Sequence, residues 1–176
     1  MPAAKTRVVL LTGDGKGKSS SALGMVLRAV GQGLRVALIH FIKADLATGE
    51  TLALARFPEV ELHFCGRGFI RQPSPARLAL HREAAARGLD LARVSLQDSR
   101  IGMVVLDEIC GAITLGLLDT QAVIDVVRSA SVGKIVILTG RGAPRELIDL
   151  ADTVSRVDAV KHAMDSGWPA QPGVEY

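Results

Sequence analysis

The sequence predicts an α/β fold in which a mostly parallel central sheet is covered by helices on both faces. Short apolar runs of strand length alternate along the chain with segments of helical periodicity. These runs are almost continuously apolar, which is typical of strands buried on both faces. At 176 residues the chain fits one domain, 1–176, and its Gly- and Pro-rich end, 161–176, is expected to be a tail over the surface.

Six segments are expected to form the strands of this sheet. Most are short runs of Val, Ile and Leu, and one of them, Ile101–Glu108, stops on two acids. Val60–Cys65 differs because its apolar and polar residues alternate. In chain order, the expected strands are Arg7–Leu11, Arg35–Phe41, Val60–Cys65, Ile101–Glu108, Lys134–Gly140 and Thr153–Val157.

The segments between these strands are expected to be helices. In the first of them, Leu23, Val26, Leu27 and Val30 share one helical face. Ser74 followed by proline is a typical helix start, and Gly88 is expected to interrupt or end the helix that follows. The expected helices are Ser20–Gly33, Gly49–Phe57, Leu78–Leu91, Thr120–Ala130 and Pro144–Ala151.

Composition narrows the class of protein. The formal net charge is +3, and basic residues are interleaved with acids, so no nucleic-acid partner is expected. Cys65 and Cys110 lack a CxxC pattern and are expected to be reduced thiols, and the four histidines lack HExxH spacing. No apolar run is long enough for a membrane helix. A cytoplasmic protein without a membrane partner is therefore expected.

A phosphate-binding loop is expected between the first strand and the first helix. Its glycines let backbone N–H groups point inward, the helix start adds a positive dipole end, and Lys18 brings a charge to a polyphosphate. The match to the GxxxxGKS pattern is incomplete because Thr12 stands where the first glycine belongs. Lys16 either meets phosphate or is solvated. The expected nucleotide-binding residues here are Thr12, Gly13, Asp14, Gly15, Lys16, Gly17, Lys18, Ser19 and Ser20.

Polar residues at other strand ends complete the expected site, because ligands in such folds bind at the carboxyl ends of the strands. The Ser19 hydroxyl is suited to Mg²⁺, and so are Asp107 and Glu108, unless these two acids serve as a helix N-terminal pair. Arg141 either contacts the nucleotide or is a surface residue in a turn. The chain contains no asparagine, which excludes an NKxD-type guanine reader.

Several segments together resemble the ATP:corrinoid adenosyltransferases of bacterial cobalamin synthesis and salvage. The resemblance covers nearly the whole chain, and the variant loop, the TGRG to LADTVS block and the tail are jointly more specific than a phosphate loop alone. The matching segments are TGDGKGKSS (12–20), RAVGQGLRVALIHFIK (28–43), GE (49–50), GRGF (66–69), VVLDEI (104–109), LTGRGAPRELIDLADTVS (138–155) and VKHAMDSGWPAQPGVEY (160–176).

The resemblance implies a RecA-like P-loop fold, a homodimer, and ATP bound in reversed orientation. It implies that Co(I) of a corrinoid attacks the 5′ carbon of ATP, so that triphosphate leaves. Lys18 would then be catalytic by stabilising the leaving group, with Ser19 and Glu108 on Mg²⁺ or Mn²⁺ and Arg28 near the nucleotide. The substrates would be ATP and the corrinoid, with a flavoprotein reductase as electron donor.

The corrinoid-binding segment departs from the family pattern. The family carries G-F-T-W after the third strand, whereas this chain has Gly68-Phe69-Ile70-Arg71. Phe69 keeps its place, and the resemblance implies a catalytic, corrin-facing residue unless Phe69 belongs to the core. Arg71 replaces the tryptophan: it either stacks on the ring or pairs with a corrin amide, or it indicates a different corrinoid, weaker activation or a loop ordered only by substrate.

Three other functions fit the same loop. The first is a phosphotransferase or ATPase that binds ATP in the usual orientation. The second is a RecA-like ATPase acting on nucleic acid, to which the charge balance gives little support. The third is a nucleotide-binding family member that has lost corrinoid transfer.

Overall fold

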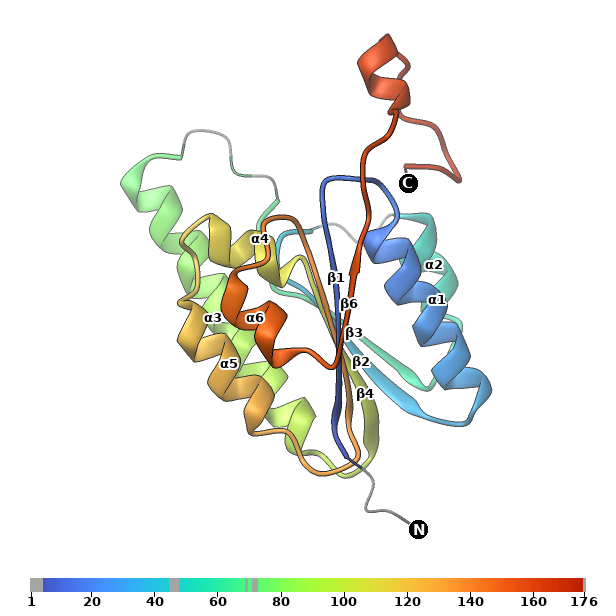
Figure 1. Ribbon diagram of the computed structural model, residues 1–176, viewed down its shortest axis with the longest axis vertical. Coiled ribbons are helices and arrows are strands. Elements are labelled where there is room, and N and C mark those ends of the chain that lie inside the picture. Colours follow the sequence, from blue (N-terminus) through green and yellow to red (C-terminus); the bar gives the residue numbers. More distant parts are fainter. Residues whose placement is uncertain (1–4, 45–47, 69, 71–72, 176) are drawn as a thin grey trace.

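A computed structural model describes residues 5–44, 48–68, 70 and 73–175 of the protein, and it has the expected layered α/β architecture (Figure 1). Six strands form one sheet in the order β3-β2-β4-β5-β1-β6, and every pairing is parallel. The fold class is therefore confirmed. The strands are β1 (Arg7–Thr12), β2 (Arg35–His40), β3 (Val60–Phe64), β4 (Ile101–Asp107), β5 (Ile135–Thr139) and β6 (Thr153–Arg156).

Helices cover both faces of the sheet (Figure 1). One core packs α1 (Lys18–Gly31) and α2 (Gly49–Leu54) against residues such as Val36, Leu38 and Val105. The other core is larger and packs four helices against residues such as Ile39, Val104 and Leu138. These helices are α3 (Pro75–Gln97), α4 (Ile109–Thr114), α5 (Thr120–Arg128) and α6 (Arg145–Leu150).

The prediction that Gly88 interrupts or ends its helix is wrong, because α3 continues through Gly88. Ser74 caps it as expected, since its side chain accepts a hydrogen bond from the Arg77 N–H. A Cβ atom at Gly88 would lie 2.8 Å from the Cβ of Cys65 and 3.1 Å from Cε1 of Phe41. This glycine therefore allows the helix to approach the sheet closely and is not a stop signal.

Gly88→Ala should lower the free energy of unfolding by about 1–3 kcal/mol, because the added methyl group overpacks a close helix–sheet contact. Chemical denaturation measures the loss. Arg87→Ala, one position away on an exposed part of the helix, should change stability by less than about 0.5 kcal/mol. Equal stability of the two variants would contradict this packing role.

The C-terminal part of the chain is tied to the phosphate loop before it leaves the sheet. Val157 N–H donates to the Thr12 carbonyl, and Gly15 N–H donates to the Val157 carbonyl, each at 2.8 Å. The tail then extends away from the sheet instead of lying over the surface as expected (Figure 1). It forms the short 3-10 helix η1 (Ala163–Ser166) and returns towards the loop, where Lys16 Nζ lies 3.6 Å from Glu175 Oε1.

None of the helices within the described ranges is both long and apolar enough to cross a membrane.

Both cysteines are free, as expected. Burial raises the pKa of both thiols, that of Cys110 to about 12, so neither is an activated nucleophile.

Candidate active site

The phosphate loop lies at the carboxyl ends of the strands, where β1 passes into α1. Gly13 and Gly17 adopt φ values of 100° and 118°, a region that L side chains rarely occupy. Gly17 precedes α1, and no side chain caps the N–H groups of the first turn. These free donors and the positive end of the helix dipole form a site for an anion.

Lys18 is the buried cation of this loop. It is 6% exposed, and its Nζ donates a 2.7 Å hydrogen bond to the Gly15 carbonyl. Burial lowers the pKa of Lys18, and Arg141 adds to this effect, whereas the carboxylates of Glu108, Asp14 and Asp107 oppose it. A positive charge held away from water interacts more strongly with a polyphosphate than an exposed one.

Asp107 joins the loop to the sheet. Its Oδ1 accepts hydrogen bonds from the hydroxyls of Ser19 at 2.7 Å and Thr139 at 2.8 Å, and its Oδ2 lies 2.8 Å from Nδ1 of His40. Burial disfavours the charged carboxylate, but these hydrogen bonds and the nearby His40 bring the pKa of Asp107 below its usual value. The arrangement is not a nucleophile triad, because the serine hydroxyl donates to the acid and not to the histidine.

Glu108 has an unusual, left-handed backbone conformation. Its φ of 60° makes it the one non-glycine residue with positive φ in the described chain. Its N–H donates to the Thr139 hydroxyl at 2.9 Å. Burial and the neighbouring charge of Asp107 raise the pKa of Glu108, although Lys18 and Arg141 oppose this. Within the described residues its carboxylate makes no hydrogen bond or ion pair, so it is available to a ligand.

The structure brings most of the predicted residues to one place. Thr12 and Gly15 are buried in the loop, while Asp14, Lys16 and Ser20 are exposed. Arg141 is exposed in the turn after β5 and lies close enough to affect the pKa of both Lys18 and Glu108. The structure therefore places Arg141 near Lys18 and Glu108, and its contact with the nucleotide stays a prediction.

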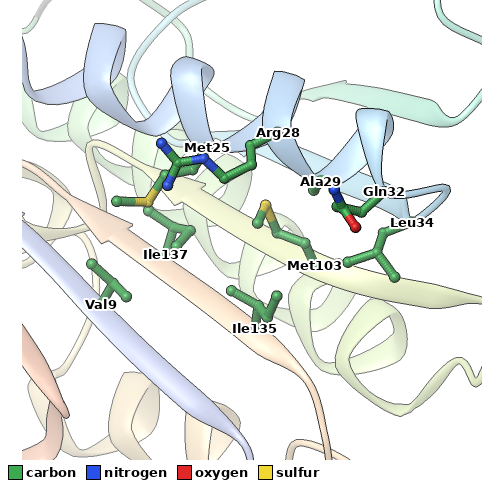
Figure 2. Close-up of a pocket in the computed structure, with 9 residues that line it drawn as sticks. All are labelled: Val9, Met25, Arg28, Ala29, Gln32, Leu34, Met103, Ile135 and Ile137. Carbon is green, nitrogen blue, oxygen red and sulfur yellow. The ribbon is translucent and has the colours of Figure 1, made fainter.

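Arg28 is not brought to the loop. It lies in the last turn of α1, ten residues after Lys18, which corresponds to about 15 Å along a helix. There it lines an apolar pocket on the sheet (Figure 2). Its contact with the nucleotide stays a prediction.

Phe69 and Arg71 lie outside the described residues. The backbone that leads into their segment is closely packed, because a Cβ atom at Gly66 would lie 2.1 Å from the carbonyl carbon of Ile42. The Gly68 N–H donates to the Ile42 carbonyl at 2.9 Å. The roles of Phe69 and Arg71 stay predictions.

Comparison with known proteins identifies the family. The family model of ATP:corrinoid adenosyltransferase BtuR/CobO/CobP matches residues 4–176. The chain belongs to this family. It is 42% identical to the corrinoid adenosyltransferase of Pseudomonas aeruginosa, over 97% of this chain and 84% of that protein. It is 36% identical to the corrinoid adenosyltransferase of Escherichia coli K12, over 96% of this chain and 85% of the relative. The chain is therefore a corrinoid adenosyltransferase, which confirms the prediction from sequence.

A solved structure supports the fold of this adenosyltransferase. The flagellar accessory protein FlaH of Methanocaldococcus jannaschii superposes with a TM-score of 0.57 at 9% identity, covering 88% of this chain and 71% of that one. The similarity concerns the fold alone and is consistent with the RecA-like P-loop class predicted for the adenosyltransferase.

Two residues of the adenosyltransferase site have no assigned role in the sequence prediction. His40 and Thr139 both end strands of the sheet, and both contact Asp107. The available signal is their position, since each is a polar residue at the carboxyl end of an apolar run. That signal places a residue at the edge of the sheet but does not identify its partner.

Proposed function

We propose that this adenosyltransferase transfers the 5′-deoxyadenosyl group of ATP to Co(I) of a corrinoid and releases inorganic triphosphate. In this step an electron pair of Co(I) forms the Co–C5′ bond. The bond from C5′ to the triphosphate oxygen breaks, and triphosphate leaves with that electron pair. Cobalt becomes formally Co(III), and no proton is transferred, so the protein needs no general base.

The observation that carries this proposal is the buried Lys18 beside an uncapped helix start. In this arrangement the lysine and the loop N–H groups hold the triphosphate and stabilise the charge that it gains on leaving. Arg141 adds a second cation at the same edge of the sheet. Positioning and electrostatic stabilisation are what such a reaction requires of the protein.

The test follows which bond of ATP breaks. Incubation with ATP, Mg²⁺ and chemically reduced cobalamin should give adenosylcobalamin and triphosphate in equal amounts, measured by absorbance and by ion chromatography. ADP and phosphate without adenosylcobalamin would instead support the phosphotransferase or ATPase alternative.

The proposal includes Mg²⁺ or Mn²⁺ held by the Ser19 hydroxyl and the Glu108 carboxylate. Oxygen ligands of this kind suit Mg²⁺. The described residues include no group of three or more His, Cys, Asp or Glu that could hold a metal ion. In the proposal the ion therefore keeps several waters and takes phosphate oxygens from the nucleotide. When bound, the ion neutralises charge on the triphosphate.

Glu108→Gln should raise the Mg²⁺ concentration needed for half-maximal activity by about 10-fold or more, because the amide keeps the shape but loses the charge. A titration of activity with Mg²⁺ measures the shift. Glu146→Gln, an exposed acid in the first turn of α6, is the control and should leave the titration unchanged. An unchanged titration for Glu108→Gln would remove this residue from the metal site.

A homodimer is also part of the proposal. An apolar pocket of about 230 Å³ lies beside α1 on the face of β1, β4 and β5, and Figure 2 shows Met25, Met103 and Ile137 around it. The neighbouring edge strand β6 is exposed along its whole length. A second copy of the chain would cover this apolar surface.

Light scattering tests the dimer. The wild-type protein should have twice the mass of the chain, and Met25→Glu should reduce it to the monomer mass, because the charge would be buried without a partner. Leu52→Glu, on the exposed side of α2, is the control and should remain dimeric. A monomeric wild-type protein would overturn the proposed dimer.

We propose in addition that a flavoprotein reductase supplies the electron that forms Co(I).

A further inference from the structure

His40 occupies the end of β2 beside the end of β4, directly opposite Asp107 in the register of the two strands. The histidine and the aspartate are each 2% exposed. The His40 ring stacks on Phe64 of the next strand, with ring centroids 4.8 Å apart and ring planes 22° apart. The histidine is therefore held from both sides at the edge of the sheet where the nucleotide loop lies.

The chemistry of Asp107 fixes the direction of its hydrogen bond with His40. An ionised carboxylate can only accept hydrogen bonds, so Nδ1 of His40 is the donor to Oδ2. The other oxygen, Oδ1, is used by the hydroxyls of Ser19 and Thr139. All hydrogen-bonding groups around this carboxylate are thus donors, and each of its oxygens has a partner.

The bond to His40 controls how the carboxylate is oriented. Two hydroxyls on Oδ1 alone would leave the carboxyl plane free to turn about that oxygen, with Oδ2 buried and unpaired. The imidazole fixes Oδ2 and therefore the plane. Because the Ser19 proton is donated to Oδ1, the lone pairs of the serine oxygen are not used by Asp107 and stay free for a metal ion.

We propose that His40 is a positioning residue for the Mg²⁺–triphosphate site, acting through Asp107 on the hydroxyl of Ser19. The inference rests on the proposed metal site. Thr139 extends the effect, because its hydroxyl donates to Asp107 and accepts from the N–H of Glu108. One buried carboxylate thereby connects His40 to both residues assigned to the metal ion.

The test measures ATP binding by calorimetry with Mg²⁺ and with EDTA, in the absence of any corrinoid. For the wild-type protein, Mg²⁺ should tighten ATP binding. In His40→Ala this gain should fall by about 10-fold, because Asp107, the hydrogen-bond partner of the proposed ligand Ser19, loses the contact that fixes its orientation. His40→Gln should retain most of the gain, because its amide N–H₂ can donate to the same oxygen.

A matched control is available on the adjacent strand. His63 is half-buried on β3, and its Nε2 has no hydrogen-bond partner within the described residues. His63→Ala should leave the gain from Mg²⁺ unchanged. Thermal melting checks the fold of each variant, and His40→Leu, which fills the space without donating, replaces His40→Ala if the alanine variant does not fold.

The possible results separate the two proposals. No tightening by Mg²⁺ in the wild-type protein would refute the metal site itself. Tightening in the wild-type protein that survives unchanged in His40→Ala or His40→Leu would refute the role of His40 alone. Equal loss in His40→Gln would also refute it, because the ring and not the donated hydrogen bond would then matter.

Discussion

Lys18→Ala should lower kcat/KM for ATP by about 10²- to 10³-fold, because it removes the buried cation that stabilises the departing triphosphate. The loss should appear mainly in kcat, since charge on the leaving group grows in the transition state. Steady-state kinetics with saturating reduced corrinoid measure it. The fold should persist, because among the residues that the structure describes the Lys18 side chain donates its hydrogen bond to the neighbouring Gly15 carbonyl and to no distant element.

Lys16→Ala is the comparison variant, and it also decides between the two alternatives left open for Lys16. Lys16 is exposed in the same loop, and its charge lies 3.6 Å from the Glu175 carboxylate. An exposed charge is screened by water, so the effect on kcat/KM should stay within a few fold if Lys16 is solvated. Equal losses in the two variants, or more than a tenth of wild-type activity in Lys18→Ala, would contradict the role given to Lys18.

Gly13→Ala should lower the free energy of unfolding by about 3 kcal/mol or more, because backbone strain and a steric clash add at this position. The φ of 100° disfavours any side chain, and the new Cβ would lie 2.4 Å from the Val157 carbonyl oxygen. The carbonyl oxygen belongs to the backbone, and the position of the Cβ is fixed by the backbone of residue 13, so neither atom can rotate away. Denaturant unfolding measures stability, and calorimetry should show weakened ATP binding.

Two other glycines separate strain from clash. Gly17→Ala meets a similar φ of 118° but has no atom within 4 Å of the added Cβ, so it should cost only the strain, about 1–3 kcal/mol. Gly24→Ala lies inside α1 with open space around it and should stabilise the protein by about 0.5–1 kcal/mol. A Gly13→Ala variant as stable as Gly17→Ala would show that the contact with Val157 is unimportant.

Most of the fold could be predicted from local sequence, because each strand is a short apolar run with polar or turn residues at its ends. The helix α3 shows the limit. Gly88 has the chemistry of a helix stop, and only the position of Cys65 and Phe41 across the interface reveals that it allows close packing. The short helix α4 has no side-chain cap and contains Gly111, so it lacks the usual signals of a helix.

The sequence could predict those site residues that come directly after a predicted strand. Loop residues and Glu108 carry a recognisable pattern, whereas the contact between His40 and Asp107 depends on the register of β2 against β4. That register is a property of the whole sheet and not of either segment. The same reasoning applies to Arg28, whose distance from the loop follows from the length and direction of α1.

The place of β1 in the sheet has a consequence for biosynthesis. This early strand pairs with β5 and β6, so that Arg7 meets Ile135 and Val9 meets Thr153. A nascent chain emerging from the ribosome exposes its glycine-rich segment long before those partners are translated. The segment therefore acquires its final conformation only after β5 and β6 are translated, when β2, β3 and β4 have had time to assemble.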